Sequence, residues 1–182
     1  MTQTRRIFIG LPLAPQMRKR LKQEMASWPK EALLQTAEEN LHVTLMFLGF
    51  VNEERIPEIC RSVEQAVSSH EAFELQFTGM ELREDREHPK MVWLSGEPSE
   101  ELRLLYEDLE KAFSSFVTGK KQFRPHITLA KIKKSRWLKL PSPPEFKTSL
   151  SLVEPIDTVA VFESLVIDGK RRYEQIDSFP LV

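Results

Sequence analysis

Apolar residues recur along the chain with two different spacings, which distinguish the expected strands from the expected helices. Alternating or continuous runs of strand-forming residues predict strands at residues 5–13, 41–48, 73–77, 91–95, 125–132, 150–153, 159–167 and 173–179. Apolar residues at helical spacing predict amphipathic helices through residues 17–28, 56–67 and 99–116. The chain therefore places groups of strands around single helices.

Local signals indicate where several of these elements begin and end. Asn52 and Ser99 are residue types that cap helix N-termini, and Gly119 is expected to end the third helix. Asp168 followed by Gly169 suits a hairpin turn between the last two strands. The sequence lacks the glycine-rich phosphate loop of doubly wound nucleotide-binding folds. We therefore expect an α+β fold with antiparallel pairing.

The composition is that of one compact globular unit. The chain has 182 residues, 41% of them hydrophobic, and 26 Lys and Arg nearly balance 27 Asp and Glu. Its longest apolar stretch, residues 41–50, is far shorter than the roughly 20 residues of a membrane-spanning helix. No signal-peptide core is recognisable before the first strand, and the single cysteine, Cys60, cannot form an intramolecular disulfide. These features predict a soluble cytoplasmic protein.

The near-zero net charge hides a strongly basic segment. Residues 111–144 contain nine Lys and Arg residues and no Asp or Glu. Such segregation can steer an anion to one surface of a protein, although a solvated basic loop is the more ordinary explanation of a charge run. The segment is therefore a candidate for contact with a phosphorylated ligand.

Two of the expected strands carry the same short motif. His-Val-Thr-Leu at 42–45 recurs as His-Ile-Thr-Leu at 126–129. Alternate residues of a strand share a face and lie about 6 to 7 Å apart, so each histidine shares a face with the threonine two positions later. The intervening apolar residues face a core on the other side. If two similar halves pack together, His42 with Thr44 and His126 with Thr128 meet across one cleft.

This arrangement suits acid–base chemistry at phosphorus. One imidazole can accept a proton while the other donates one, because histidine titrates near neutral pH. Threonine hydroxyls can donate hydrogen bonds to the non-bridging phosphate oxygens. A lone histidine in an apolar strand is more often a packed residue, but the repeated pattern favours a paired site. His70 and His88 lack this setting and are expected to be exposed polar residues.

Two other chemistries are less well supported. The chain has no His-Glu-x-x-His motif and no cysteine cluster, whereas catalytic zinc usually has three protein ligands. Acyl transfer would need a nucleophile, but there is no Gly-x-Ser-x-Gly elbow, and Cys60 falls on the apolar face of its helix. We therefore expect no metal at the site.

Residues around both motifs resemble the two-histidine phosphoesterase superfamily. The relevant runs are Leu-His-Val-Thr-Leu-Met-Phe-Leu-Gly at 41–49 and Phe-Arg-Pro-His-Ile-Thr-Leu-Ala at 123–130. They are most similar to the bacterial and archaeal RNA 2′,3′-cyclic phosphodiesterases first described as 2′-5′ RNA ligases. The resemblance implies a single bilobal domain over residues 1–182, an internal duplication with an antiparallel sheet and helices in each lobe and the active-site cleft between the lobes.

The resemblance also implies an activity and a set of site residues. The enzyme would open a terminal 2′,3′-cyclic phosphate on RNA to a 2′-phosphate, without metal or cofactor, and could join RNA ends in reverse. His42 would be the general acid and His126 the general base. Thr44 and Thr128 would hold the phosphate. The residues expected to help bind the substrate are Arg124, Lys131 and Tyr173.

The predicted activity implies a partner, and two alternative functions stay open. The expected partner is RNA with a terminal 2′,3′-cyclic phosphate, with tRNA fragments among the candidates, and a monomer is the default oligomeric state. One alternative is an RNA-binding module without turnover. Another is a related phosphodiesterase that acts on small cyclic nucleotides or 2′-5′ linked oligonucleotides. The basic segment favours a longer anionic substrate.

Overall fold

The computed structural model describes residues 3–84, 88–116 and 123–182. Gly119 and two lysines of the basic segment, Lys120 and Lys121, lie outside these ranges. The third helix, expected to run to Gly119, ends earlier, at Ala112. The strands are β1 (Thr4–Pro12), β2 (Leu33–Gln35), β3 (His42–Asn52), β4 (Phe73–Arg83), β5 (Met91–Gly96), β6 (His126–Ile132), β7 (Leu152–Ile156), β8 (Thr158–Ile167) and β9 (Lys170–Pro180). The helices are α1 (Pro15–Glu24), α2 (Ile56–Val67), α3 (Glu100–Ala112) and α4 (Lys134–Trp137).

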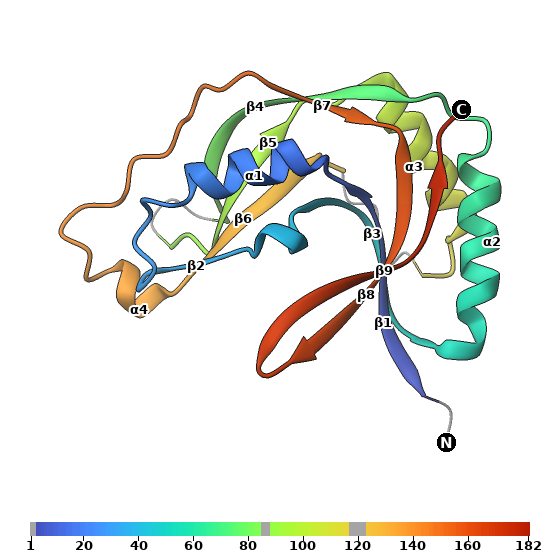
Figure 1. Cartoon of the computed structure of the whole chain (residues 1–182), viewed down its shortest axis with the longest axis horizontal. Coiled ribbons are helices and arrows are strands. Elements are labelled where there is room, and N and C mark those ends of the chain that lie inside the picture. Colours follow the sequence, from blue (N-terminus) through green and yellow to red (C-terminus); the bar gives the residue numbers. More distant parts are fainter. Residues whose placement is uncertain (1–2, 85–87, 117–122) are drawn as a thin grey trace.

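The described strands form one curved antiparallel sheet, so the α+β class is confirmed (Figure 1). The strand order is β7-β4-β5-β6-β3-β1-β8-β9, and β2 pairs with β6. The family resemblance implies a separate sheet in each lobe, but the structure has one continuous sheet. The two halves join because β3 and β6 are neighbours and Val43 pairs with Ile127. The two motif strands therefore lie side by side at the middle of the sheet.

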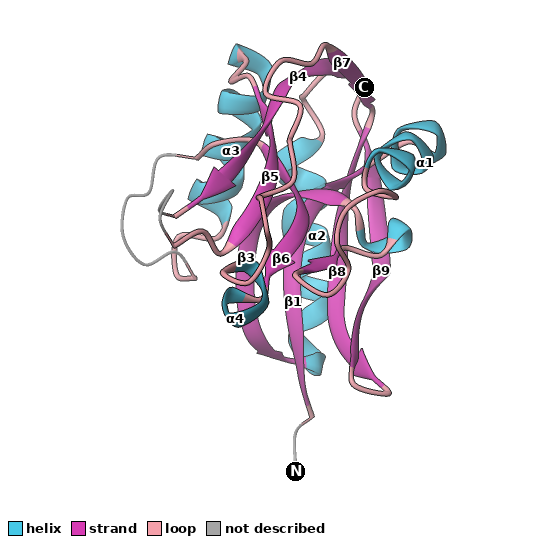
Figure 2. Cartoon of the chain, turned by 90° about the vertical axis from the view of Figure 1, so that its left-hand side faces the viewer, coloured by secondary structure: helices cyan, strands magenta, loops and turns pink. Residues whose placement is uncertain are grey.

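The predicted helix signals are largely confirmed. The side chain of Asn52 accepts a hydrogen bond from the backbone N–H of Glu54 at 3.1 Å, within a short 3-10 turn that leads into α2. Ser99 caps α3 by accepting from the backbone N–H of Leu102 at 3.2 Å. Helix α1 ends at Glu24, earlier than expected, and Trp28 is buried in the turns that follow. Helices α1 and α3 lie on opposite sides of the strands (Figure 2).

Three short elements differ from expectation. Strand β2 is too short to stand out as a pattern of its own, and it forms because Leu33 to Gln35 pair with β6. Helix α4 interrupts the basic segment with a single turn, where a loop is expected. Strand β7 begins two residues later than expected, at Leu152, because its boundaries follow its pairing with β4. The hairpin turn is confirmed, with positive φ angles of 50° at Asp168 and 73° at Gly169.

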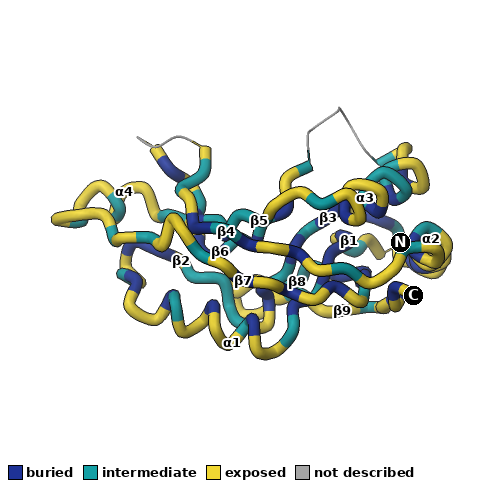
Figure 3. The backbone as a smooth tube through the Cα atoms, turned by 90° about the horizontal axis from the view of Figure 1, so that it is seen from above, coloured by how far each residue is buried: buried dark blue, intermediate teal, exposed yellow. Residues whose placement is uncertain are grey.

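The alternation predicted for the two motif strands is confirmed. Val43, Leu45, Ile127 and Leu129 are buried in the core, whereas both histidines and both threonines are partly exposed on the other face. Figure 3 shows buried backbone concentrated in the strands, with exposed positions on the outer turns of the helices. Among the helices that the structure describes, none has the length and apolar character needed to cross a membrane.

Gly79 lies where β4 meets the chain segment that precedes β7. A Cβ atom at this position would be 2.3 Å from the backbone oxygen of Thr148. Gly79→Ala is therefore expected to displace that segment and to lower the free energy of unfolding by about 2 kcal/mol. Urea denaturation measures this loss. Gln76→Ala, an exposed change on the same strand, is the control and should alter stability by no more than about 0.5 kcal/mol; equal stability of the two variants would contradict the close approach.

Candidate active site

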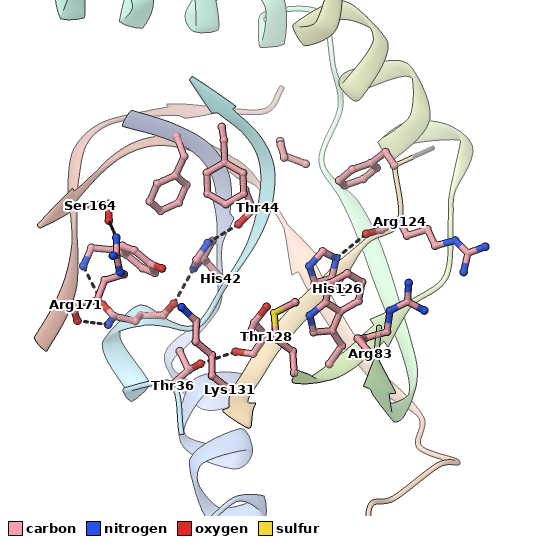
Figure 4. Close-up of a pocket in the computed structure, with 18 of the residues that line it drawn as sticks. Thr36, His42, Thr44, Arg83, Arg124, His126, Thr128, Lys131, Ser164 and Arg171 are labelled. Atoms are coloured by element: carbon pink, nitrogen blue, oxygen red, sulfur yellow. Dashed lines mark hydrogen bonds between the residues drawn. The ribbon is translucent and has the colours of Figure 1, made fainter. Parts of the chain in front are cut away.

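A pocket of about 690 Å³ opens where the two motif strands meet. Every residue proposed from the sequence for catalysis or binding lines it: His42, Thr44, Arg124, His126, Thr128, Lys131 and Tyr173. In Figure 4 the pairs from β3 and β6 converge on the same space, with His42 and His126 facing one another across it. The topology therefore brings together the chemistry that the repeated motif suggests.

His42 is held by hydrogen bonds at both ring nitrogens. Nδ1 lies 2.7 Å from the backbone oxygen of Asn40, and Nε2 lies 2.7 Å from the hydroxyl of Thr44. A carbonyl oxygen can only accept, so Nδ1 carries a proton and donates it. In the neutral ring Nε2 then accepts from the Thr44 hydroxyl. Nε2 is therefore the ring nitrogen that can take up a proton.

His126 repeats this arrangement in the second motif. Its Nδ1 donates to the backbone oxygen of Arg124, at 2.8 Å. In both motifs the acceptor is the residue two positions before the histidine, so the two rings are fixed in the same tautomer by the same local geometry. The side chain of Arg124 lines the pocket as expected, and its carbonyl adds a positioning role that residue type alone does not reveal.

Both imidazoles are neutral at neutral pH. Burial lowers the pKa of His42 to about 4, against the opposing effect of its hydrogen bond to Asn40, and the nearby His126 lowers it slightly further. Burial is also the main cause that lowers the pKa of His126, and the positive charge of Arg83 adds to it. A bound phosphate anion would raise both pKa values because opposite charge favours the imidazolium.

The electrostatic character of the pocket is positive. The described lining residues include no Asp or Glu, and their cationic side chains are Arg6, Arg83, Arg124, Lys131 and Arg171. The sequence pattern identified Arg124 and Lys131, which flank the second motif. It missed the other three because they come from β1, β4 and β9, far from either motif in the chain. The pocket therefore suits an anion, and its positive charge comes from more strands than the basic segment alone implied.

Two polar residues outside the motifs hold the strands in place. Thr36 donates its hydroxyl proton to the backbone oxygen of Thr128 at 2.7 Å, which fixes the end of β2 to β6. Asn40 is buried and bridges to β9: its amide donates to the backbone oxygen of Arg171 at 2.8 Å and accepts from the backbone N–H of Tyr173 at 2.9 Å. The spacing of Asn40 before His42 is the one signal in the sequence that could have found it.

Replacing Asn40 should weaken the fold. Asn40→Ala leaves the partly buried N–H of Tyr173 and the carbonyl of Arg171 without this partner, which costs about 2 kcal/mol. Thermal unfolding should show a lower midpoint than in the wild type. Asn52→Ala, which removes an exposed cap, is the comparison and should cost about 1 kcal/mol or less. An Asn40→Ala protein as stable as the wild type would contradict the bridging role.

The other two histidines and the single cysteine lie outside the pocket. His88 is exposed, as expected. His70 was predicted to be exposed, but its side chain is only 13% exposed. Its Nε2 lies 3.1 Å from the carboxylate of Asp108, and this contact joins α3 to the end of α2. Cys60 is buried in α2, and burial raises the pKa of its thiol, so it is a core residue. Within the described residues, His, Cys, Asp and Glu form no cluster of three or more that could hold a metal ion.

Tyr173 is packed rather than free in the pocket. Its ring meets Phe8 edge-on at 5.0 Å and His42 edge-on at 5.1 Å, and the ring of Phe8 is 4.9 Å from that of His42. These contacts form one wall of the pocket from β1, β3 and β9. The aromatic wall explains why the first imidazole is so strongly desolvated.

Several known proteins are similar to this chain in sequence. A family model described as the 2′-5′ RNA ligase superfamily matches residues 13–163. A Thermotoga maritima protein named RNA 2′,3′-cyclic phosphodiesterase is 30% identical over 140 residues, covering 74% of this chain and 75% of the relative. An Escherichia coli protein of the same name is 28% identical over 185 residues, covering 100% and 99%.

Solved structures agree with the sequence comparison. A crystal structure of a Thermus thermophilus protein matches with a TM-score of 0.81 and 23% identity, and it covers 97% of both chains. The E. coli LigT structure complexed with 3′-AMP matches with a TM-score of 0.79 and 22% identity over 98% of this chain and 99% of that one. These likenesses show a common fold. Together with the family match over most of its length, they show that this chain belongs to the 2′-5′ RNA ligase superfamily.

Proposed function

We propose that this protein hydrolyses 2′,3′-cyclic phosphate ends of RNA to 2′-phosphomonoesters by metal-independent acid–base catalysis. The observation that carries this proposal is the pair of imidazoles, each fixed through Nδ1 by a backbone carbonyl and facing one pocket. The positive lining suits an anionic phosphodiester, and the relatives named RNA 2′,3′-cyclic phosphodiesterase support the substrate class.

In the proposed reaction the two histidines act on opposite sides of phosphorus. Nε2 of His126 takes a proton from water while the water oxygen forms a bond to phosphorus. The bond from phosphorus to the ribose 3′ oxygen breaks, and Nε2 of His42 gives a proton to that oxygen. The assignment of acid and base follows the family resemblance. The positive charge of Arg83 disfavours the imidazolium form of His126.

The threonines are proposed to bind the phosphate oxygens. In the free protein the hydroxyl proton of Thr44 is directed at Nε2 of the neutral His42. When phosphate binding protonates His42, Nε2 becomes a donor, and the Thr44 hydroxyl is free to donate to a phosphate oxygen. Thr128 lines the pocket in the matching position. Protonation of the acid and binding of the phosphate are therefore coupled in this scheme.

The remaining proposed contacts are electrostatic and aromatic. Arg124 and Lys131 line the pocket beside the second motif and are proposed to neutralise the phosphate. Tyr173 is proposed to contact the nucleoside from the wall that it forms with Phe8. The same groups could catalyse the reverse step, in which a 2′-5′ bond joins two RNA ends. Monomeric state and cytoplasmic location stay predictions.

We also propose that the single domain is an internal duplication of two lobes. The order β7-β4-β5-β6 on one side of the sheet is matched by β9-β8-β1-β3 on the other, with the motif strands β6 and β3 at the inner ends. The proposed cleft then lies between the lobes, where the pocket residues of both halves meet.

The test is incubation of purified protein, in excess chelator, with a short RNA that ends in a 2′,3′-cyclic phosphate. Resolution of 2′- and 3′-phosphate products gives the regiochemistry, and the expected product is the 2′-phosphate. Bound but unconverted RNA would favour the binding-module alternative. Equal conversion of a mononucleoside 2′,3′-cyclic phosphate would favour a small cyclic nucleotide as substrate, and loss of activity in chelator would contradict metal independence.

A further inference from the structure

Trp93 lies against His126 with the two rings nearly parallel. Their centroids are 3.4 Å apart and their planes differ by 14°. Trp93 belongs to β5 and pairs with Thr128 of β6, so His126 is its diagonal neighbour across the two strands. The pairing of β5 with β6 is irregular between Val92 and Trp93, which places the irregularity at this contact. An indole face therefore supports one of the two reactive imidazoles.

Arg83 continues the stack beyond Trp93. Its guanidinium carbon is 4.7 Å from the centroid of the indole ring, a favourable cation–π arrangement. The order β4-β5-β6 places Arg83 and His126 on opposite sides of Trp93, and both lie at the same end of the pocket in Figure 4. Guanidinium, indole and imidazole are thus layered across three consecutive strands.

The indole of Trp93 lowers the stability of the fold at one atom. Its N–H is buried and has no hydrogen-bond partner within the part of the chain that the structure describes. A buried donor without a partner destabilises a protein by about 1–3 kcal/mol. A phenyl ring would pack here without that penalty. Among aromatic side chains, the indole attracts a cation most strongly, and the guanidinium of Arg83 lies over its face.

The histidine of the first motif has a different environment. His42 meets Phe8 at a tilt of 37° and Tyr173 edge-on at 86°, and no cation–π partner is found on either ring within the described residues. The layered cation is therefore specific to His126. This asymmetry distinguishes two imidazoles that the repeated motif makes look equivalent.

We propose that Arg83 and Trp93 are positioning residues for His126: the indole face fixes the plane of the imidazole, and the guanidinium beyond it keeps the imidazole uncharged and ready to accept a proton. This inference rests on the proposed role of His126 as the proton acceptor. After burial, the positive charge of Arg83 is the effect that opposes protonation of His126. Arg83 and Trp93 act through His126 and need no contact with the substrate.

Other charges act on His126 and must be included in the test. Glu81, also on β4, favours the imidazolium, but it accepts a hydrogen bond from the Ser95 hydroxyl at 2.5 Å and lies 3.6 Å from Arg83. The other ionisable side chains that line the pocket are Arg6, His42, Tyr106, Arg124, Lys131, Arg171 and Tyr173. The variants below leave all of these unchanged.

The first measurement is NMR titration of the four histidine side chains in the free protein. Arg83→Met removes the charge but keeps an unbranched chain over the indole, and it should raise the titration midpoint of His126 by about one pH unit. Arg83→Lys keeps the charge and should leave the midpoint near that of the wild type. His70, remote from the pocket, reports that the fold is intact. An unchanged midpoint in Arg83→Met would overturn the proposal.

The second measurement separates positioning from packing. Trp93→Leu should lower kcat on the cyclic phosphate by about tenfold, with KM within about twofold, because the imidazole loses its fixed plane while phosphate contacts remain. Trp93→Phe keeps an aromatic face and should restore most of the rate. Equal losses in the two variants would contradict support through the ring face. Since the titration needs no substrate, it still tests the stack if the proposed reaction is not observed.

Discussion

His42→Asn and His126→Asn are each expected to lower the rate of cyclic phosphate opening by about 10²–10⁴-fold, the usual contribution of a general acid or base. Asparagine keeps an N–H near the position of Nδ1, so the hydrogen bonds to the carbonyls of Asn40 and Arg124 can persist. It lacks the nitrogen that exchanges a proton at Nε2. The change therefore removes the chemistry while keeping the local support.

The design of this experiment uses both histidines and a third as control. The double variant should be little slower than either single one, because groups that act as a unit give strongly non-additive losses. His70→Asn removes a histidine that pairs with Asp108 outside the pocket, and its rate should stay within about twofold of the wild type. Steady-state kinetics with the cyclic RNA end gives the rates of the four variants and of the wild type. A single-site variant with nearly full activity would exclude that histidine from the mechanism.

Acidification is expected to destabilise the wild type through His42. Its pKa is about 4 in the folded protein, lowered from 6.5 by burial. Between these values the unfolded chain binds a proton that the folded chain does not, so stability is complete above the ordinary pKa and falls as the pH drops toward 4. The full loss is on the order of 3 kcal/mol. Burial of His126, whose pKa is also lowered, adds to the same slope.

Urea denaturation from pH 7 to pH 4.5 measures this dependence. In His42→Asn the side chain no longer titrates, so the difference in stability between the two pH values should be smaller than in the wild type. Gln76→Ala, an exposed change at a side chain that does not titrate, is the control and should keep the wild-type dependence. Parallel pH curves for the wild type and His42→Asn would show that the imidazole is not desolvated as the structure indicates.

Much of the site could be predicted because its chemistry is local in sequence. Strand alternation alone places His42 with Thr44 and His126 with Thr128 on one face, and the structure has the same alternation. The caps at Asn52 and Ser99 are likewise local and agree with the structure. A residue type within a few positions of its partner is sufficient for such predictions.

The contacts that could not be predicted depend on register between distant strands. Trp93 reaches His126 because β5 pairs with β6 through an irregular step, and no pattern within β5 encodes that step. Arg83 and Arg171 enter the pocket from strands whose place in the sheet follows from the whole topology. The partial burial of His70 could not be predicted either, because its partner Asp108 comes from another helix.

The place of β1 in the sheet has a consequence for how the molecule assembles. Phe8 pairs with Phe162 of β8, so the first strand finds one of its two partners nearly a whole chain length away. Contacts of such large sequence separation slow folding, because the loop between them must close first. The aromatic wall beside His42 needs Tyr173 from β9 as well. During synthesis on the ribosome, the site is therefore completed only after the last strands have emerged.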